Sequence, residues 1–416
     1  MTRNASVDAD LSLEELSLLT ETAGGEVVGI VRQKSERANR AYYIGKGKVE
    51  ELEIAREELG ANLVVFDHEL SPTQIRNLEN MVGGKIIDRT ALILDIFAQR
   101  ALSREGRLQV ELAQLSYLLP RQAGSRSYLS RLGGGIGTRG PGETQLEIDR
   151  RRIKTRITML HNEIKQLKKH RKLLHESRKG KGFKTVSLIG YTNAGKSTLL
   201  NTLTGADVFT EDKLFATLDP TVRELINNEK GKKILLSDTV GFIRNLPKQL
   251  MEAFSATLEE IQEADLLLHV VDAHRSDYDE LIASVEETLG KLEITEKPRL
   301  FVFNKADLLP ATSGEDSSRQ MIERQYSPAI FVSAQTGENI PRLRELISET
   351  LSLDNLSLTL HIPYDKWPSF SYLYNKGKVL NVSYDGEYAV VEVEINEQYT
   401  KSLLPFIKDN KDNGEE

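Results

Sequence analysis

The sequence predicts an α/β protein of several domains. We expect an N-terminal parallel α/β domain with a long antiparallel helical pair, a central doubly wound α/β domain, and a small α+β domain at the C-terminal end. Three observations predict this class: the 416 residues exceed one compact core, short apolar runs alternate with helical stretches, and two leucine- and isoleucine-rich seams interrupt the alternation. The expected domains span residues 1–105, 106–182, 183–353 and 354–416.

The first expected domain is a small parallel sheet covered by helices. Three short apolar runs predict its strands, and the two stretches between them predict helices. The second helix opens with Ser71 and Pro72, an N-cap followed by a proline at the first helical position. The expected strands are 26–31, 61–67 and 84–88, and the expected helices are 46–59 and 71–82.

Two helical seams follow, on either side of a glycine-rich loop. The segments from Leu108 to Leu119 and from Ile153 to Leu174 carry leucine and isoleucine at steps of three and four residues. Such spacing is typical of coiled coils, and the loop between the seams predicts an antiparallel pair. The second helix, about 147–178, would be roughly 48 Å long at about 1.5 Å per residue.

From Lys184 the pattern changes to repeated strand–helix units that end near residue 352. This alternation predicts the doubly wound domain. A βαββα pattern follows, in which Asp385-Gly386 predicts the two-residue turn of a hairpin and NEQYTKSLLPFI predicts the last helix. The expected strands of the doubly wound domain are KTVSLIG, KKILLSD, ADLLLHVVD, PRLFVFN and SPAIFVS.

Composition excludes several classes of protein. The chain has no cysteine, which excludes disulfides, thiolate metal sites and cysteine nucleophiles. No run of about 18 apolar residues predicts a membrane-spanning helix, and the acidic N-terminal stretch lacks the order of a signal peptide. We therefore expect a cytoplasmic monomer without stable membrane insertion, in contact with membranes only peripherally.

Charge is unevenly distributed along the chain. The net charge is −7, but residues 121–184 contain 18 Lys and Arg against 5 Asp and Glu, a local balance of +13. The rest of the chain therefore carries −20. A one-signed block inside an acidic protein favours a polyanionic partner, RNA or DNA first. A solvated helix face and an anionic membrane are the alternatives.

The segment GYTNAGKS, residues 190–197, carries the chemistry. It fits G-x-x-x-x-G-K-[ST] in the required context, because an apolar strand precedes it and a helix follows it. The backbone amides from Asn193 to Lys196 would hold phosphates at a helix N-terminus. Lys196 would reach the β- and γ-phosphates, and Ser197 would ligate Mg²⁺.

Three further motifs follow in order, each at a strand end. DTVG places Asp238 to hold Mg²⁺ through water and the Gly241 amide to sense the γ-phosphate. In NKAD, Asp307 can accept from the ring N–H and the exocyclic amine of guanine, a donor pair that adenine lacks. SAQ, residues 333–335, can offer a backbone amide to the guanine oxygen. Together the motifs predict GTP or GDP as the nucleotide.

Two features of the sequence bear on GTP hydrolysis, the first switch and the residue after Gly241. The segment FATLDPT, residues 215–221, is the expected first switch, and by chemistry either Thr217 or Thr221 could supply its Mg²⁺-binding hydroxyl. After Gly241 stands Phe242, where many signalling GTPases carry a glutamine that orients water. Phenylalanine cannot hydrogen-bond a water molecule. We therefore expect slow hydrolysis in isolation, aided by backbone groups, another local polar residue or a partner.

GYTNAGKSTLLN, FATLDPT, DTVGFI, NKAD and above all GGGIGTRGPGETQLEIDRR resemble the HflX family, in the Obg–HflX group of translation-factor-like P-loop GTPases, over almost the whole chain. The resemblance implies a GTPase whose N-terminal and helical regions bind the large (50S) ribosomal subunit and its rRNA, with a loop that reaches toward the peptidyl-transferase region. It also implies a role in splitting or rescuing stalled ribosomes under stress, and it places the Mg²⁺ ligand of the first switch at Thr217.

The expected site residues fall into three groups. We expect Lys196, Thr217 and Gly241 to be catalytic, and Ser197 and Thr217 to hold Mg²⁺. The arginines expected to bind RNA phosphates are Arg131, Arg139, Arg150, Arg151 and Arg152. The expected nucleotide contacts are Gly190, Tyr191, Thr192, Asn193, Ala194, Gly195, Lys196, Ser197, Thr198, Phe215, Ala216, Thr217, Leu218, Asp219, Asp238, Thr239, Val240, Gly241, Asn304, Lys305, Ala306, Asp307, Ser333, Ala334 and Gln335.

The glycine-rich loop contains a second phosphate-binding pattern, which its context excludes. Gly135, Gly137 and Gly140 spell G-x-G-x-x-G, but no strand ends at the first glycine and no βαβ unit follows. We expect this loop to probe RNA instead.

Two other functions stay open. The chain could be a signalling switch that docks to a membrane or a protein partner through its basic helical arm. It could also be an RNA-binding module with a vestigial GTPase, although the complete set of nucleotide motifs weighs against that.

Overall fold

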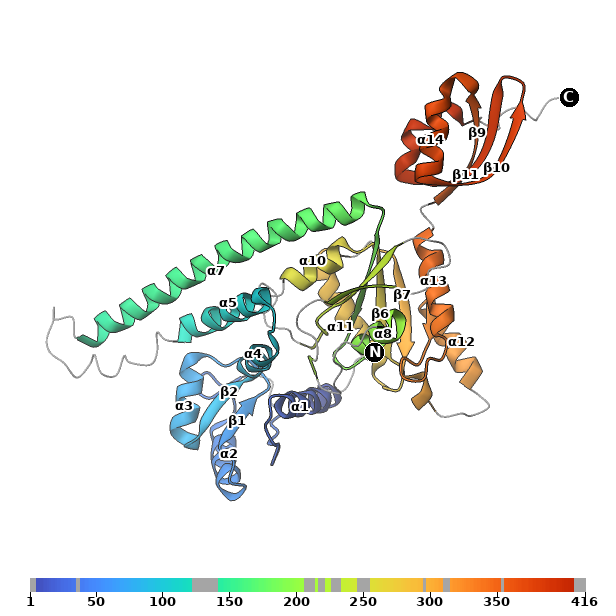
Figure 1. Ribbon diagram of the computed structural model, residues 1–416. Coiled ribbons are helices and arrows are strands. Elements are labelled where there is room, and N and C mark those ends of the chain that lie inside the picture. Colours follow the sequence, from blue (N-terminus) through green and yellow to red (C-terminus); the bar gives the residue numbers. More distant parts are fainter. Residues whose placement is uncertain are drawn as a thin grey trace. The chain divides into compact units, whose positions relative to one another are not determined.

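The structure of the chain is a computed structural model (Figure 1). It forms two compact units, Met1–Ile340 and Pro341–Glu416. Among the described residues, no helix is long and apolar enough to cross a membrane. The described residues are 5–34, 38–121, 141–205, 214–215, 221–225, 233–244, 255–294, 297–309, 315–352 and 355–407.

The N-terminal region is a small α/β layer, as the sequence predicts. Strands β1 and β2 pair in parallel, with Leu63 opposite Lys85, and α2 and α3 contribute to the core beside them (Figure 1). Val49, Leu78 and Ile86 are buried in that core, since helix and strand each turn one apolar face inward. The elements are α1 (Ala5–Thr22), α2 (Lys46–Glu58), β1 (Leu63–Phe66), α3 (Pro72–Val82), β2 (Lys85–Asp88) and α4 (Arg89–Arg100).

Two helix starts in this region are fixed by local hydrogen bonds. The Ser71 side chain accepts from the Gln74 amide at 3.3 Å, and the Gln74 side chain accepts from the Ser71 amide at 2.9 Å. With Pro72 at the first helical position, this capping box confirms the predicted start of α3. The Asp88 side chain accepts from the Ala91 amide at 2.9 Å and so caps α4 directly after β2.

The predicted strand at 26–31 is wrong. The segment is not in a strand, and Val28 and Ile30 are 46% and 48% exposed. Only Val31 packs against the core of α2 and α3. The short apolar run predicts a strand, but a strand also needs a neighbouring strand to hydrogen-bond. Within the described residues, β1 and β2 pair only with each other.

The two seams form the predicted antiparallel helical pair. Helix α5 spans Arg104–Arg121 and α7 spans Pro141–Gly180, which is longer than the sequence predicts. Leucine and isoleucine side chains of both helices form one buried cluster. Ion pairs show that the two helices run antiparallel. Glu111 lies 2.7 Å from Arg156, whereas Glu105, which is earlier on α5, lies 2.8 Å from Arg171, which is later on α7.

The central part is the predicted doubly wound domain. Its six strands lie in the order β4-β5-β3-β6-β7-β8, and all neighbours are parallel except β4 and β5. The antiparallel edge strand β4 was not predicted, because TVRE has only one aliphatic residue. The elements are β3 (Lys184–Gly190), α8 (Lys196–Thr204), β4 (Thr221–Glu224), β5 (Ile234–Asp238), α10 (Ser255–Glu263), β6 (Leu266–Asp272), α11 (Tyr278–Lys291), β7 (Arg299–Asn304), η2 (Ala306–Leu308), α12 (Glu315–Gln325) and β8 (Ala329–Phe331).

The C-terminal unit contains an antiparallel sheet in the order β10-β11-β9, with its own core. The hairpin turn lies one residue later than predicted: Asp385 pairs with Tyr388, so Gly386 and Glu387 form the turn, and Gly386 has a φ of +56°. The predicted last helix consists of two short 3₁₀ helices. The elements are α13 (Ile340–Ser352), β9 (Asn355–Pro363), η3 (Tyr364–Lys366), α14 (Trp367–Lys376), β10 (Gly377–Asp385), β11 (Tyr388–Asn396), η4 (Glu397–Ser402) and η5 (Leu404–Phe406).

Candidate nucleotide site

The phosphate loop joins the end of β3 to the start of α8. Gly190 has a φ of +148° and Gly195 a φ of +87°. A Cβ atom at Gly190 would lie 2.1 Å from the Val270 carbonyl oxygen, and one at Gly195 would lie 2.2 Å from Nδ2 of Asn304. Both positions therefore require glycine. The turn that they allow brings the N-terminus of α8 to the loop, an arrangement that binds phosphate.

Lys196 is the first residue of α8 and is buried. Its Nζ donates to the carbonyl oxygens of Gly190 at 3.2 Å and Tyr191 at 2.9 Å, so the ammonium lies across the loop. Burial lowers the pKa of Lys196 to about 8, while the charge of Asp238 opposes that shift. The loop thus holds a cation in a poorly solvated position where phosphate oxygens can replace its carbonyl contacts.

Ser197, a predicted Mg²⁺ ligand, lies beside Asp238, which is predicted to contact the ion through water. The Ser197 hydroxyl donates to Oδ2 of Asp238 at 2.6 Å, and Asp238 is fully buried at the end of β5. A hydroxyl and a carboxylate at this distance, beside a phosphate loop, fit Mg²⁺, which prefers oxygen ligands and usually shares them with phosphates and water. The described residues hold no cluster of three His, Cys, Asp or Glu, and the expected site does not require one.

The segment Thr239–Arg244 follows β5, and we call it the second switch; it lies directly on the phosphate loop. Phe242 donates its amide to the Gly190 oxygen at 3.1 Å, and Thr192 donates its amide to the Phe242 oxygen at 2.9 Å. A Cβ atom at Gly241 would lie 2.7 Å from Cγ2 of Thr192 and 2.9 Å from Nζ of Lys196. The ring of Phe242 is 5% exposed and packs in the hydrophobic core, so it offers no polar group to the nucleotide.

Only the first residue of the predicted nucleotide contacts in the first switch can be placed. Phe215 is 2% exposed and meets the Phe97 ring edge-on, with 4.6 Å between ring centroids. Thr221 begins β4, where it pairs with Asp238. The other predicted contacts lie outside the described residues, and their roles stay predictions: Ala216, Thr217, Leu218 and Asp219.

The guanine motifs meet at the ends of β7 and β8. Nδ2 of Asn304 donates to the Ala194 oxygen at 2.9 Å, and Oδ1 of Asn304 accepts from the Ala334 amide at 3.0 Å. Asn304 therefore joins the phosphate loop to the SAQ segment. Lys305 has a φ of +64°, and its Nζ lies 2.8 Å from Oδ2 of Asp272. Asp307 is exposed, as an acceptor for a guanine base must be.

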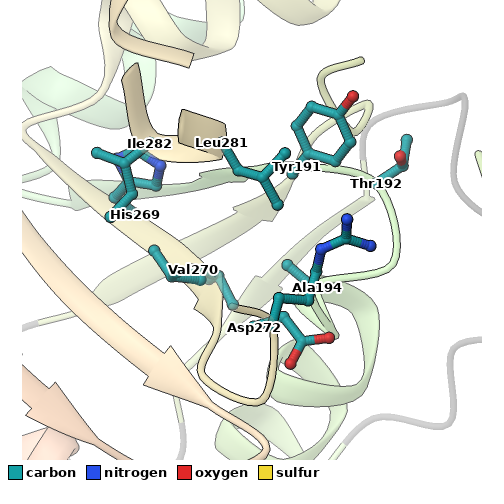
Figure 2. Close-up of a pocket in the computed structure, with 10 residues that line it drawn as sticks. Tyr191, Thr192, Ala194, His269, Val270, Asp272, Leu281 and Ile282 are labelled. Carbon is teal, nitrogen blue, oxygen red and sulfur yellow. The ribbon is translucent and has the colours of Figure 1, made fainter. Parts of the chain in front are cut away.

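A small pocket borders the phosphate loop. Figure 2 shows Tyr191, Thr192 and Ala194 of the loop opposite residues of β6 and α11. His269 lines the pocket and is fully buried, which lowers its pKa, so this imidazole is a neutral packing residue. None of the residues of NKAD, SAQ or DTVG lines the pocket, so the pocket does not join the phosphate loop to the guanine motifs.

Two contacts of the motif residues were not predicted from the sequence. Asp272, which pairs with Lys305, ends an apolar strand exactly as Asp238 does, so its position could have identified it. Glu15 of α1 was not predictable in this way: it accepts from the hydroxyl of Tyr191 at 2.5 Å, across 176 positions of sequence. No local pattern indicates such a contact.

The basic residues are divided between described and undescribed parts of the chain. Arg150, Arg151 and Arg152 are exposed on α7, and the nearest acid to Arg152 is Asp149 at 3.9 Å. Arg131 and Arg139, with the rest of the glycine-rich loop, lie outside the described residues. Their contact with RNA stays a prediction.

Comparisons with known proteins indicate a GTP-binding protein over most of the chain. The chain matches family models described as GTP-binding GTPase N-terminal over residues 10–98, GTP-binding GTPase Middle Region over residues 100–178, and 50S ribosome-binding GTPase over residues 185–305. GTPase HflX of Caldanaerobacter subterraneus is 49% identical over 403 residues, which cover 97% of this chain and 92% of that protein. GTPase HflX of Escherichia coli is 45% identical and covers 86% of this chain and 83% of its own length.

A solved structure of a GTP-binding protein from Sulfolobus solfataricus in complex with GDP is 28% identical, covers 82% of this chain and 95% of its own, and has a TM-score of 0.44. The three matched families and the full-length relatives carry the assignment. The chain therefore belongs to the HflX family of GTPases, enzymes that bind and hydrolyse GTP.

Proposed function

We propose that this GTPase binds the 50S ribosomal subunit and its rRNA, and that GTP hydrolysis controls the binding. Its role would be to split or rescue stalled ribosomes under stress. The proposal is supported by the match of residues 185–305 to a family described as 50S ribosome-binding GTPases. It is also supported by the +13 charge balance of residues 121–184 in an otherwise acidic chain.

The observation that carries the proposal is the position of α7. This helix exposes Arg150, Arg151 and Arg152, and it also contacts α10, the first described helix after the second switch. Glu259 of α10 lies 2.8 Å from Lys168 and 2.9 Å from Arg171, both on α7. An RNA contact on α7 and the switch that senses the γ-phosphate would therefore be linked through packed helices.

Hydrolysis would follow the usual division of roles in a P-loop GTPase. Ser197 and Thr217 would hold Mg²⁺, with Asp238 contacting it through water. When bound, the ion neutralises charge on the β- and γ-phosphates. Lys196 would contact the same phosphates, and the Gly241 amide would bind the γ-phosphate. Because the ring of Phe242 is buried in the core, this chain offers no glutamine-like group at that position, and a partner that orders the switches would accelerate the reaction.

The test is GTP turnover with and without purified 50S subunits, paired with co-sedimentation in GDP and in a non-hydrolysable GTP analogue. We expect 50S subunits to increase turnover at least tenfold, and co-sedimentation to require the analogue. Lys196→Ala serves as the control without hydrolysis. Turnover that is indifferent to 50S subunits, with binding to anionic vesicles instead, would support a membrane-docking switch and contradict the proposal.

A further inference from the structure

A buried polar cluster joins the N-terminal region to the phosphate loop. Glu15 of α1 is 8% exposed and Arg89 of α4 is 3% exposed. Arg89 donates to Glu15 at 2.7 Å and to Asp67 at 2.8 Å, so both carboxylate partners of its guanidinium lie in the N-terminal region. The Tyr191 hydroxyl donates to the second oxygen of Glu15 at 2.5 Å. Figure 2 shows this hydroxyl directed away from Val270 and Asp272.

The same cluster holds the second switch by its backbone. The amide of Arg244 donates to the Tyr191 hydroxyl at 2.8 Å, and the Arg244 carbonyl accepts from Arg89 at 3.3 Å. Tyr191 is therefore a hydrogen-bond acceptor from the switch and a donor to Glu15. Because one hydroxyl makes both bonds, Tyr191 links the position of Glu15 to that of the Arg244 amide.

Gly241, three residues before Arg244, lies beside the ammonium of Lys196. The amide of Phe242 donates to the Gly190 oxygen at 3.1 Å and the amide of Thr192 donates to the Phe242 oxygen at 2.9 Å, so hydrogen bonds hold this segment on the phosphate loop. A single carbon added to Gly241 would lie 2.9 Å from Nζ of Lys196. In a P-loop GTPase that ammonium contacts the β- and γ-phosphates. GTP therefore has to displace Gly241 from the ammonium, whereas GDP carries no γ-phosphate to do so.

We propose that Glu15 and Tyr191 are positioning residues that set the preference of the site for GDP over GTP. Through Arg244 they hold the second switch on the phosphate loop, and GTP binding has to break these contacts. Breaking these contacts costs free energy, and this cost lowers the affinity for GTP but not the affinity for GDP.

The variant Tyr191→Phe separates this role from packing. It removes the bond to Glu15 and the bond from Arg244, while the ring keeps its place in the core of Ile189 and Phe242. The matched control is Tyr117→Phe. Tyr117 is 7% exposed and donates to the buried Asp88 at 2.8 Å, so Tyr117→Phe loses the same kind of bond, but one that does not involve the second switch.

The experiment measures, for each full-length protein, the ratio of its affinities for a fluorescent GDP and a non-hydrolysable GTP analogue. We expect Tyr191→Phe to shift the ratio at least tenfold toward the analogue, about 1.4 kcal/mol. Glu15→Gln should shift it in the same direction but less, because the amide oxygen still accepts from Tyr191. Tyr117→Phe should leave the ratio within twofold of the original.

Two results would overturn the proposal. One is an unchanged ratio in both Tyr191→Phe and Glu15→Gln. The other is an equal shift in Tyr117→Phe, which would show that any loosened hydrogen bond of the N-terminal region has this effect. The double variant completes the test: if Glu15 acts through Tyr191, Glu15→Gln should add nothing to Tyr191→Phe, whereas additive shifts would mean that the two residues act separately.

Discussion

Lys196 is buried before any phosphate reaches it, and this gives nucleotide binding a pH dependence. Its pKa is about 8 in the nucleotide-free protein, below the ordinary value of a lysine, because burial disfavours the charged form. Bound phosphates favour that charged form and raise the pKa again. Binding therefore takes up a proton at pH values above about 8, and the affinity falls as pH rises through that value.

We expect GDP affinity to decrease about sixfold between pH about 7 and about 8.8, the range in which the free lysine loses most of its charge. Isothermal titration in two buffers of different ionisation enthalpy would show the affinity and the proton uptake together. For the stability of the nucleotide-free protein the sign is reversed: it should rise with pH between the folded pKa of about 8 and the unfolded value of 10.5. An affinity that stays constant over this range would contradict the low pKa of Lys196.

At the scale of residues, motifs with local spacing were predictable and contacts between distant segments were not. Gly190 to Ser197, Asp238 and Asn304 could be recognised because each stands in a short pattern at a strand end, where parallel strands bring their carboxyl ends together. The sequence also predicts that Asn304 supports the loop and the acceptor edge of the base, and here its amide group joins the phosphate loop to Ala334, a partner that no local pattern names. Which partner a side chain selects depends on three-dimensional distances.

The helical pair offers a prediction at the scale of elements. Leu160 of α7 is fully buried and packs with Leu108 and Leu112 of α5, whereas Leu173 of the same helix is 64% exposed. Leu160→Ala should lower the free energy of unfolding by about 2–5 kcal/mol through lost burial and a residual cavity. Leu173→Ala should change it by less than about 0.5 kcal/mol. Urea unfolding followed by circular dichroism measures both, and equal effects would mean that the seam does not stabilise the pair.

Helices and strands could be predicted where the spacing of apolar residues alone determined the secondary structure. The seam spacing predicted α5 and α7, and continuous apolar runs predicted the buried strands β3 and β6. Failures occurred where strand pairing decided the structure. The segment 26–31 is an apolar run but has no partner strand among the described residues, and β4 has a partner but little apolar character. The hairpin turn at Gly386 was displaced by one residue because the register of β10 and β11 set it.

At the scale of the whole molecule, the sequence shows where basic residues are concentrated, but only the structure shows which of them are paired with acids. The basic block of residues 121–184 is visible in composition alone. The division of its charges is not: Arg171 is paired with Glu105 and Glu259, and Arg156 with Glu111, so these arginines hold α7 to its neighbours. The exposed arginines at 150–152 are the better candidates for a phosphate contact.

This division predicts the salt dependence of ribosome binding. If Arg150, Arg151 and Arg152 each neutralise one phosphate, replacing all three with alanine should reduce the slope of log affinity against log salt by about 2 to 3. The matched control removes three exposed cations outside the N-terminal and helical regions, Arg324→Ala, Lys376→Ala and Lys378→Ala, with the same change in net charge. Because phosphate contacts act locally while net charge acts over the whole molecule, the control should leave the slope nearly unchanged. Co-sedimentation with 50S subunits over a series of salt concentrations measures both slopes. Equal slopes in the two variants would show that net charge, and not a contact on α7, draws this GTPase to the ribosome.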